Sequence, residues 1–209
     1  MATFLRPLSY KHQWLYDTFS RLAALPLGGE SKFRQLPLQG LTIAADSKIL
    51  DLCCGSGQST KFLVQQSPNV TGLDASPLSL ARAKNNVPQA HYVEGMAEQM
   101  PFPDQTFDLV HTSAALHEMS PEQLQEILQE VDRVLVPGGV FILTDFHQAT
   151  NPLFLSGLWL FLWLFETETA WELLETDLGE LLEKLGLIVI NNRLYAGGSL
   201  QVIQAQKPV

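Results

Sequence analysis

Short apolar runs alternate along the chain with stretches in which apolar residues recur every three or four positions. The first pattern is typical of buried strands and the second of helices that cover a sheet. Strands are expected at residues 48–52, 70–73, 90–93, 107–111, 140–144, 187–190 and 200–205. Strands that alternate with helices predict an α/β fold, with a mostly parallel sheet covered by helices on both faces.

Local start signals place the helices between these strands. Ser76 and Ser120 each precede a proline, and a hydroxyl cap followed by a first-turn proline is typical of a helix start. These two helices are expected to run to about residues 86 and 135. Further helices are expected at residues 10–25 and 58–66, and from a cap at Thr176 to a stop at Gly186.

The length of 209 residues fits one domain with a small addition. We expect residues 1–47 to form an N-terminal helical extension or cap, because glycines and prolines interrupt the pattern after residue 25. Residues 48–209 would form the main domain, with an apolar insert at 152–166. The uncharged run at 153–165 is shorter than the ~18 to 20 residues of a membrane-spanning helix, so a buried, interfacial or lid helix is expected.

Charge and composition limit the classes of partner and the cellular compartment that we expect for this protein. The net charge of −9 argues against a nucleic-acid partner, which needs a basic face. The only two cysteines, Cys53 and Cys54, are adjacent at the end of a strand, where neighbouring side chains point apart, so reduced thiols are expected. No charged-then-apolar signal pattern begins the chain. These features predict a cytoplasmic protein.

A glycine-rich turn follows the first strand. Gly55 and Gly57 permit backbone angles that other residues avoid, and they let a nucleotide-like ligand lie against the main chain. The third glycine of a dinucleotide fingerprint is replaced by Thr60, and the carboxylate of Asp51 would repel a pyrophosphate and favour a cationic ligand. An ordinary turn without a ligand remains the alternative, because glycine-rich turns are common.

Asp74 ends the second strand, 23 residues after Asp51. This spacing suits a carboxylate that binds ribose hydroxyls at the carboxyl edge of a parallel sheet. Taken alone, Asp74 is equally well explained as an acid that caps the following helix.

Five ordered motifs together resemble those of the class I S-adenosylmethionine-dependent methyltransferases. The motifs are LDLCCGSG at 50–57, GLDAS at 72–76, GMAEQMPF at 95–102, FDLV at 107–110 and LVPGG at 135–139. The resemblance covers about residues 48–146. It implies a Rossmann-like sheet of seven strands with an antiparallel last strand, and S-adenosyl-L-methionine as the cofactor.

The resemblance also implies roles for individual residues. The turn would hold the methionine part of the cofactor, Asp74 would bind both ribose hydroxyls, and His111 would offer backbone near the methionine end. Met96 departs from the family, which often has an acid there. The implied cofactor-binding residues are Asp51, Cys53, Gly55, Gly57, Asp74, Ala75, Met96, Ala97 and His111.

Methyl transfer by in-line displacement needs a base only where the acceptor must lose a proton. His117, after the fourth strand, is the candidate for that base, with a structural histidine as the alternative reading. His147, after the fifth strand, is a second candidate on the substrate side. No cluster has zinc-site spacing, and the sequence gives no reason to expect a metal.

Four aromatic residues, Tyr10, Trp14, Trp159 and Trp163, are candidates to contact the acceptor, with core packing as the ordinary alternative. The apolar segment predicts a lid over a small, apolar acceptor and a peripheral membrane contact. A buried helix and a homodimer interface remain the alternatives.

A narrower resemblance to the ubiquinone/menaquinone C-methyltransferases rests on 16–17, Leu27-Gly28-Gly29, Arg34, TDFHQ at 144–148 and NPL at 151–153. The chain is shorter than those enzymes between residues 165 and 178. The main functional hypothesis is methyl transfer by in-line displacement to a small, apolar acceptor, such as a quinone-like or lipid-like molecule. A non-catalytic S-adenosylmethionine-binding or assembly module is the alternative, and the missing third glycine disfavours a dehydrogenase.

Overall fold

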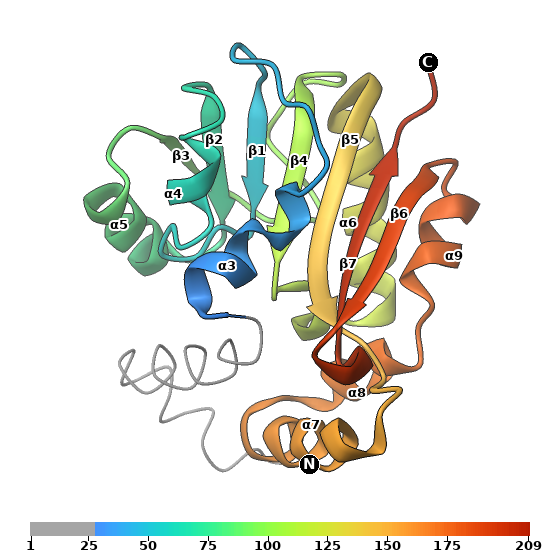
Figure 1. The fold of residues 1–209 in the computed structure, drawn as a ribbon. Coiled ribbons are helices and arrows are strands. Elements are labelled where there is room, and N and C mark those ends of the chain that lie inside the picture. The colour runs from blue at the N-terminus through green and yellow to red at the C-terminus, as the bar shows by residue number, and fades with distance from the viewer. Residues whose placement is uncertain (1–27) are drawn as a thin grey trace.

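The computed structural model describes residues 28–209, and these form a seven-stranded sheet in the order β3-β2-β1-β4-β5-β7-β6 (Figure 1). The strands are β1 Ile49–Leu52, β2 Val70–Asp74, β3 His91–Glu94, β4 Phe107–Ser113, β5 Leu135–Phe146, β6 Ile188–Tyr195 and β7 Leu200–Gln206. Strands β1 to β5 pair in parallel, and β7 runs antiparallel to both β5 and β6. The predicted fold class is confirmed.

The helices lie before β1 and, as the alternation predicts, between the strands that follow it. They are α3 Glu30–Gln35, α4 Thr60–Leu63, α5 Pro77–Asn86, α6 Pro121–Val134, α7 Pro152–Phe165, α8 Glu168–Leu174 and α9 Leu178–Lys184, with 3-10 turns η2 Leu36–Leu38, η3 Leu116–Glu118 and η4 Ala196–Gly198. The predicted helix at 10–25 lies outside the described residues. So do its candidate site residues Tyr10 and Trp14, and a domain boundary near residue 47 stays a prediction.

The predicted helix starts at Ser76 and Ser120 are correct. Ser76 Oγ accepts a hydrogen bond from the Ser79 amide at 3.2 Å, and Ser120 forms a reciprocal capping box with Gln123. The predicted cap at Thr176 is wrong, because the side chain that accepts from the first turn of α9 is Asp177, with a 3.0 Å bond from the Glu180 amide. Both residue types cap helices well, so local sequence does not choose between them.

Several element boundaries also differ from the sequence prediction, and the strand predicted at 187–190 continues to Tyr195 as β6. Helix α4 is only four residues long, because the chain on either side of it remains in turns. Strand β4 continues to Ser113, two residues beyond the predicted end at His111. Strand β5 begins at Leu135, and the predicted turn at 137–139 is an irregularity within it, where Gly138 adopts a φ of +78° and the register with β4 shifts.

Alternate residues of the strands contribute side chains to two apolar layers, one on each face of the sheet. On one face Leu50, Leu52 and Phe141 pack against α6, α8 and α9. On the other face Ile49 and Ile142 pack against α4 and the chain around η2. Because successive strand side chains point to opposite faces, a sheet covered on both sides buries nearly continuous apolar runs.

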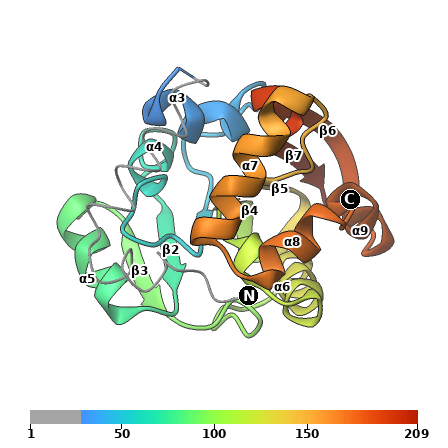
Figure 2. The ribbon, with the colours of Figure 1, turned by 90° about the horizontal axis from the view of Figure 1, so that it is seen from below.

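The carboxyl ends of β1 to β5 meet along one edge of the sheet, the lower edge in Figure 1. Helix α3 and helix α7 lie at this edge, and the view from below in Figure 2 shows α7 extended beneath the strand ends. Among residues 28–209, no helix is long and apolar enough to cross a bilayer.

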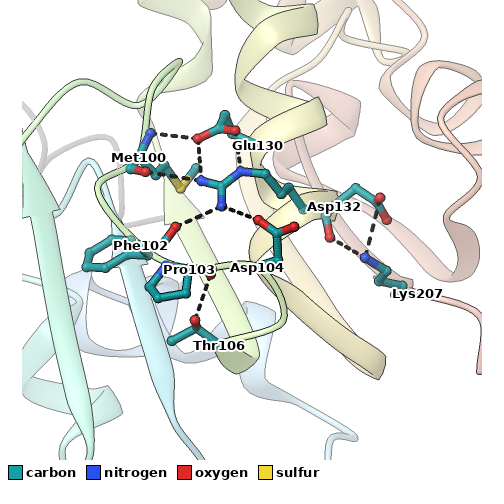
Figure 3. A network of polar contacts seen from close by, with 9 residues as sticks. Met100, Phe102, Pro103, Asp104, Thr106, Glu130, Asp132 and Lys207 are labelled. Carbon is teal, nitrogen blue, oxygen red and sulfur yellow. Dashed lines mark hydrogen bonds and ion pairs between the residues drawn. The ribbon is translucent and has the colours of Figure 1, made fainter.

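A network of hydrogen bonds and ion pairs around Arg133 fixes the loop that follows β3 (Figure 3). Its guanidinium pairs with both oxygens of Glu130 at 2.6 and 2.8 Å, and it donates to the carbonyls of Met100 and Phe102 at 3.1 and 2.7 Å. Glu130 also accepts from the Met100 amide at 2.7 Å, and Arg133 holds the pKa of Glu130 below its usual value. Helix α6 is thereby tied to the 95–102 motif.

Replacing Arg133 by Met should destabilise the protein by about 2 kcal/mol, because several charge-assisted hydrogen bonds to loop carbonyls are lost. For a chain of this size, the melting temperature should fall by about 4 to 8 °C. Thermal unfolding followed by circular dichroism would measure it. Lys184→Met, which breaks an exposed pair with Glu180, is the matched control and should shift the midpoint by about 1 °C or less. An Arg133→Met protein that melts with the wild type would show that the network contributes nothing.

Candidate active site

The glycine turn leaves β1 in a left-handed backbone conformation. Cys53, Gly55 and Gly57 have φ values of +55°, +54° and +81°. The turn is held from within by a bond of 3.0 Å from the Gly57 amide to the Cys54 carbonyl, and against β2 by one of 3.0 Å from the Cys54 amide to Leu73. Among residues 28–209, a side chain built at Gly55 would meet nothing within 4 Å, whereas one at Gly57 would touch Tyr92 and Val87 at 3.4 Å. The turn therefore presents bare main chain to open space at Gly55.

Asp51 lies behind this turn and is buried. One carboxylate oxygen accepts from the Thr60 hydroxyl at 2.5 Å, and the other bonds Nδ1 of His111 at 2.8 Å. An ionised carboxylate only accepts, so Nδ1 carries the hydrogen. Thr60, which occupies the place of a third fingerprint glycine, thus ties the first turn of α4 to the end of β1.

Asp74 lies across the turn at the end of β2. Its Oδ2 accepts from the Gly55 amide at 2.8 Å and its Oδ1 from the Ser76 amide at 2.9 Å. Each oxygen of a carboxylate has two lone pairs, so both oxygens retain capacity for a ligand hydroxyl. The capping and ribose-binding interpretations of Asp74 are therefore compatible.

Apolar side chains lie beyond Asp74 at the same edge. Met96, after β3, and Leu78, near the start of α5, are both exposed, and Ala75 is exposed beside Asp74. Ala97 is buried in the main core, so its side chain anchors the loop. Leu78 is a candidate that the sequence interpretation missed, because one leucine on an amphipathic helix carries no distinguishing signal.

The two thiols are free. Burial and then the carboxylates of Asp74 and Asp51 raise the pKa of Cys53 to about 12, and burial likewise raises the pKa of Cys54. Both side chains are therefore uncharged thiols at neutral pH, and Cys53 packs against the core.

Arg34 of α3 reaches this edge from the N-terminal side. It is buried, and it donates to Gln58 Oε1 at 2.6 Å and to the Ser113 hydroxyl at 3.3 Å. Gln58 follows the glycine turn and Ser113 ends β4, so a buried cation bridges the two strand ends. The sequence interpretation assigned Arg34 to the quinone-methyltransferase resemblance but not to the cofactor site.

The side chain of His111 lies behind Asp51, and its Nε2 is buried without a hydrogen-bond partner among residues 28–209. Because β4 continues to Ser113, the residue pairs with Asp51 and with Ile142 inside the sheet. The expected role of the His111 backbone near the methionine end of the cofactor stays a prediction. The chain leaves β4 at Ala114, which has a φ of +55°.

His117 is buried between two carboxylates. Its Nδ1 lies 2.7 Å from Oδ1 of Asp145, at the end of β5, and its Nε2 lies 3.5 Å from Oε2 of Glu166, after α7. Burial alone would lower the pKa of His117, but Asp145 and then Glu166 raise it to about 10. An imidazole protonated at neutral pH is poorly suited to take a proton from an acceptor, so this geometry favours the structural interpretation of His117.

The remaining predicted substrate residues are placed separately. Nδ1 of His147 bonds the Gly198 carbonyl at 2.9 Å, which fixes the ring against the loop before β7. Trp159 and Trp163 are each about half exposed on α7, while Leu158 and Leu162 of the same helix are buried against α8. Helix α7 therefore has one packed side and one exposed aromatic side.

Comparisons with known proteins agree with this geometry. Residues 49–139 match the methyltransferase domain family, and the chain is 58% identical over 206 residues to an uncharacterized methyltransferase of Synechocystis sp., covering 99% of this chain and 97% of that protein. The chain belongs to the S-adenosylmethionine-dependent methyltransferases. Its cofactor is S-adenosylmethionine.

Relatives of lower sequence identity are named as quinone methyltransferases. A 2-phytyl-1,4-naphthoquinone methyltransferase of Thermosynechococcus vestitus is 34% identical over 66% of this chain and 63% of its own length. A demethylmenaquinone methyltransferase of Lysinibacillus sphaericus is 29% identical over 80% and 81%. Among solved structures, an S-adenosylmethionine-dependent methyltransferase of Mesorhizobium loti shares the fold with a TM-score of 0.66 and 20% identity, over 86% of this chain and all of that one.

The residues at the strand ends fit this methyltransferase's cofactor. The open space over Gly55 admits a ligand against the main chain, and Asp74 has unused acceptor capacity for ribose hydroxyls. The carboxylates of Asp51 and Asp74 favour a cationic sulfonium over a pyrophosphate. The contacts of individual residues with the cofactor stay a prediction.

Asp74→Ala should weaken S-adenosylhomocysteine binding by roughly ten- to a hundred-fold, or about 1.5 to 3 kcal/mol, because a charged acceptor for hydroxyls is lost. Isothermal titration calorimetry would measure the dissociation constant. Glu126→Ala, which removes an exposed acid from α6, is the control for net charge and should bind as the wild type does. An unchanged constant in folded Asp74→Ala protein would remove Asp74 from the site.

Proposed function

We propose that this methyltransferase acts on a small, apolar acceptor of the quinone type. The observation that carries the proposal is the exposed aromatic side of α7, which lies at the same edge of the sheet as the glycine turn. The names of the relatives from Thermosynechococcus and Lysinibacillus support a quinone acceptor.

The apolar surface of α7 is large for a helix at a ligand-binding edge. Leu153, Leu160 and Trp163 are 84%, 57% and 52% exposed, and Trp159 lies 6.1 Å from the ring of Trp171. Aromatic and aliphatic side chains of this kind suit a flat ring with an apolar tail. A sugar or nucleotide acceptor would not need so apolar a surface.

For methyl transfer, the protein has to position the cofactor and the acceptor more than it has to transfer a proton. S-adenosylmethionine supplies, when bound, an activated methyl group on a sulfonium. The glycine turn and Asp74 would hold the cofactor, and α7 would place the acceptor and exclude water from the reacting atoms. Asp51, Thr60 and His111 act from behind the turn by fixing its shape.

The same surface of α7 favours a peripheral contact with a membrane. At about 1.5 Å per residue, the 14 residues of α7 measure about 21 Å, which is shorter than the ~30 Å hydrocarbon core. A helix of this length with exposed tryptophans would lie in the interface and deliver an apolar acceptor from the bilayer. Contact between two copies of the chain through α7 is the alternative use of the surface.

Trp163→Glu should keep the melting temperature and S-adenosylhomocysteine affinity of the wild type, because the side chain is exposed. Its kcat/KM should fall at least tenfold with a demethylated naphthoquinone that carries an apolar tail, measured by transfer of a labelled methyl group. Ile190→Glu, at a similarly exposed position on β6, is the matched control and should retain activity.

Two outcomes would contradict the acceptor assignment. An unfolded Trp163→Glu protein would place the residue in the core. A change of oligomeric state at full activity, seen by size-exclusion chromatography, would make α7 a dimer interface. Loss of vesicle co-sedimentation in the variant, with the control unaffected, is the result expected for a membrane contact.

A further inference from the structure

The cluster of His117, Glu118 and Glu166 is assembled from two distant places in the chain. His117 and Glu118 belong to η3, which follows β4, whereas Glu166 follows α7, and these residues are 48 positions apart. One donor atom from each of the three lies within 4.8 Å of the others. Neither their sequence spacing nor any local motif reveals this convergence.

We infer that His117, Glu118 and Glu166 form a binding site for a divalent transition-metal ion. An imidazole nitrogen with two carboxylate oxygens suits Zn²⁺, Mn²⁺ or Fe²⁺, because imidazole disfavours Mg²⁺ and Ca²⁺ and the absence of thiolate disfavours softer ions. The inference concerns ion binding, and it stands whether or not the acceptor is a quinone.

The separation of the two buried donors is the first argument. Nε2 of His117 and Oε2 of Glu166 lie 3.5 Å apart, which is longer than the usual N–H···O hydrogen bond of about 2.7 to 3.2 Å. Two ligands bound at about 2.1 Å to one tetrahedral ion are about 3.4 Å apart. The pair is therefore spaced as ligands of a shared ion, although both side chains are buried.

The orientation of the imidazole is the second argument. Asp145 accepts from Nδ1 of His117 at 2.7 Å, so Nδ1 carries the hydrogen and Nε2 is directed to the glutamates. Asp145 is itself fixed by the amides of Ala115, Leu116 and Phe146, at 3.2, 2.8 and 2.8 Å. A carboxylate that orients the second nitrogen of a ligating histidine is a frequent feature of metal sites.

Charge is the third argument. The two buried carboxylates of Asp145 and Glu166 both face the single imidazole of His117. Buried negative charge is costly. A divalent ion in place of the Nε2 proton would offset more of that charge, and the exposed position of Glu118 gives water and the ion access to the site.

Calorimetric titration of the full-length, chelator-treated protein with Zn²⁺ alone, and separately with Mn²⁺ alone, tests the site. We expect one ion per chain for at least one of the two metals. Repeating the titration in buffers of different ionisation enthalpy should show release of about one proton at pH 7, because the ion displaces the proton on His117.

Glu118→Gln should weaken binding at least tenfold without affecting folding, since the residue is exposed. Glu126→Gln, an exposed acid on α6, is the matched control and should bind the ion as the wild type does. Glu166→Gln should also weaken binding, provided that its circular dichroism spectrum is native. S-adenosylhomocysteine affinity in the Glu118→Gln protein should be unchanged, which separates failure of this site from failure of the cofactor site.

Two results would overturn the inference. One is the absence of stoichiometric binding of both metals to the wild type. The other is binding that Glu118→Gln leaves unchanged, because the ion would then occupy another group such as the exposed His91.

Discussion

The buried carboxylate of Asp51 is the constraint on which the cofactor edge depends. It stands near the end of the inner strand β1, and it joins α4 through Thr60 and β4 through His111. Because a buried carboxylate without partners costs several kcal/mol, these bonds leave the turn little freedom to rearrange. The bare main chain at Gly55 and the carboxylate of Asp74 are therefore presented in fixed positions, at the edge of the sheet where the strand order reverses between β1 and β4.

Two arginine side chains also hold this edge of the sheet in place. Arg133 ties the loop after β3 to α6, and Arg34 bridges the glycine turn and the end of β4. The His117 cluster lies next along the edge, between η3, β5 and the junction of α7 and α8. The glycine turn and Asp74 thus lie in the first half of the sheet, whereas the His117 cluster and α7 come from segments after β4 and β5. In the proposed arrangement, different halves of the sheet hold the cofactor and the acceptor.

Sequence predicted the features that local patterns determine. Alternation located all seven strands, and hydroxyl-proline pairs located the starts of α5 and α6. It failed where two residues compete locally, as with Asp177 and Thr176, and where pairing decides, as in the extension of β4 to Ser113. The sequence did not predict the contact between His117 and Glu166, because the two residues are far apart in the chain. For the same reason, the sequence could propose His117 as a base but could not see the carboxylates that raise its pKa.

The central claim is that the turn between β1 and α4 binds S-adenosylmethionine, and calorimetry with two ligands tests it most directly. Titration of the wild-type protein with S-adenosylhomocysteine should give one site per chain, and titration with NAD should give no binding heat. The reason is that Thr60 occupies the third glycine position and the acids at the strand ends disfavour a pyrophosphate. Saturable NAD binding without any response to S-adenosylhomocysteine would contradict the account.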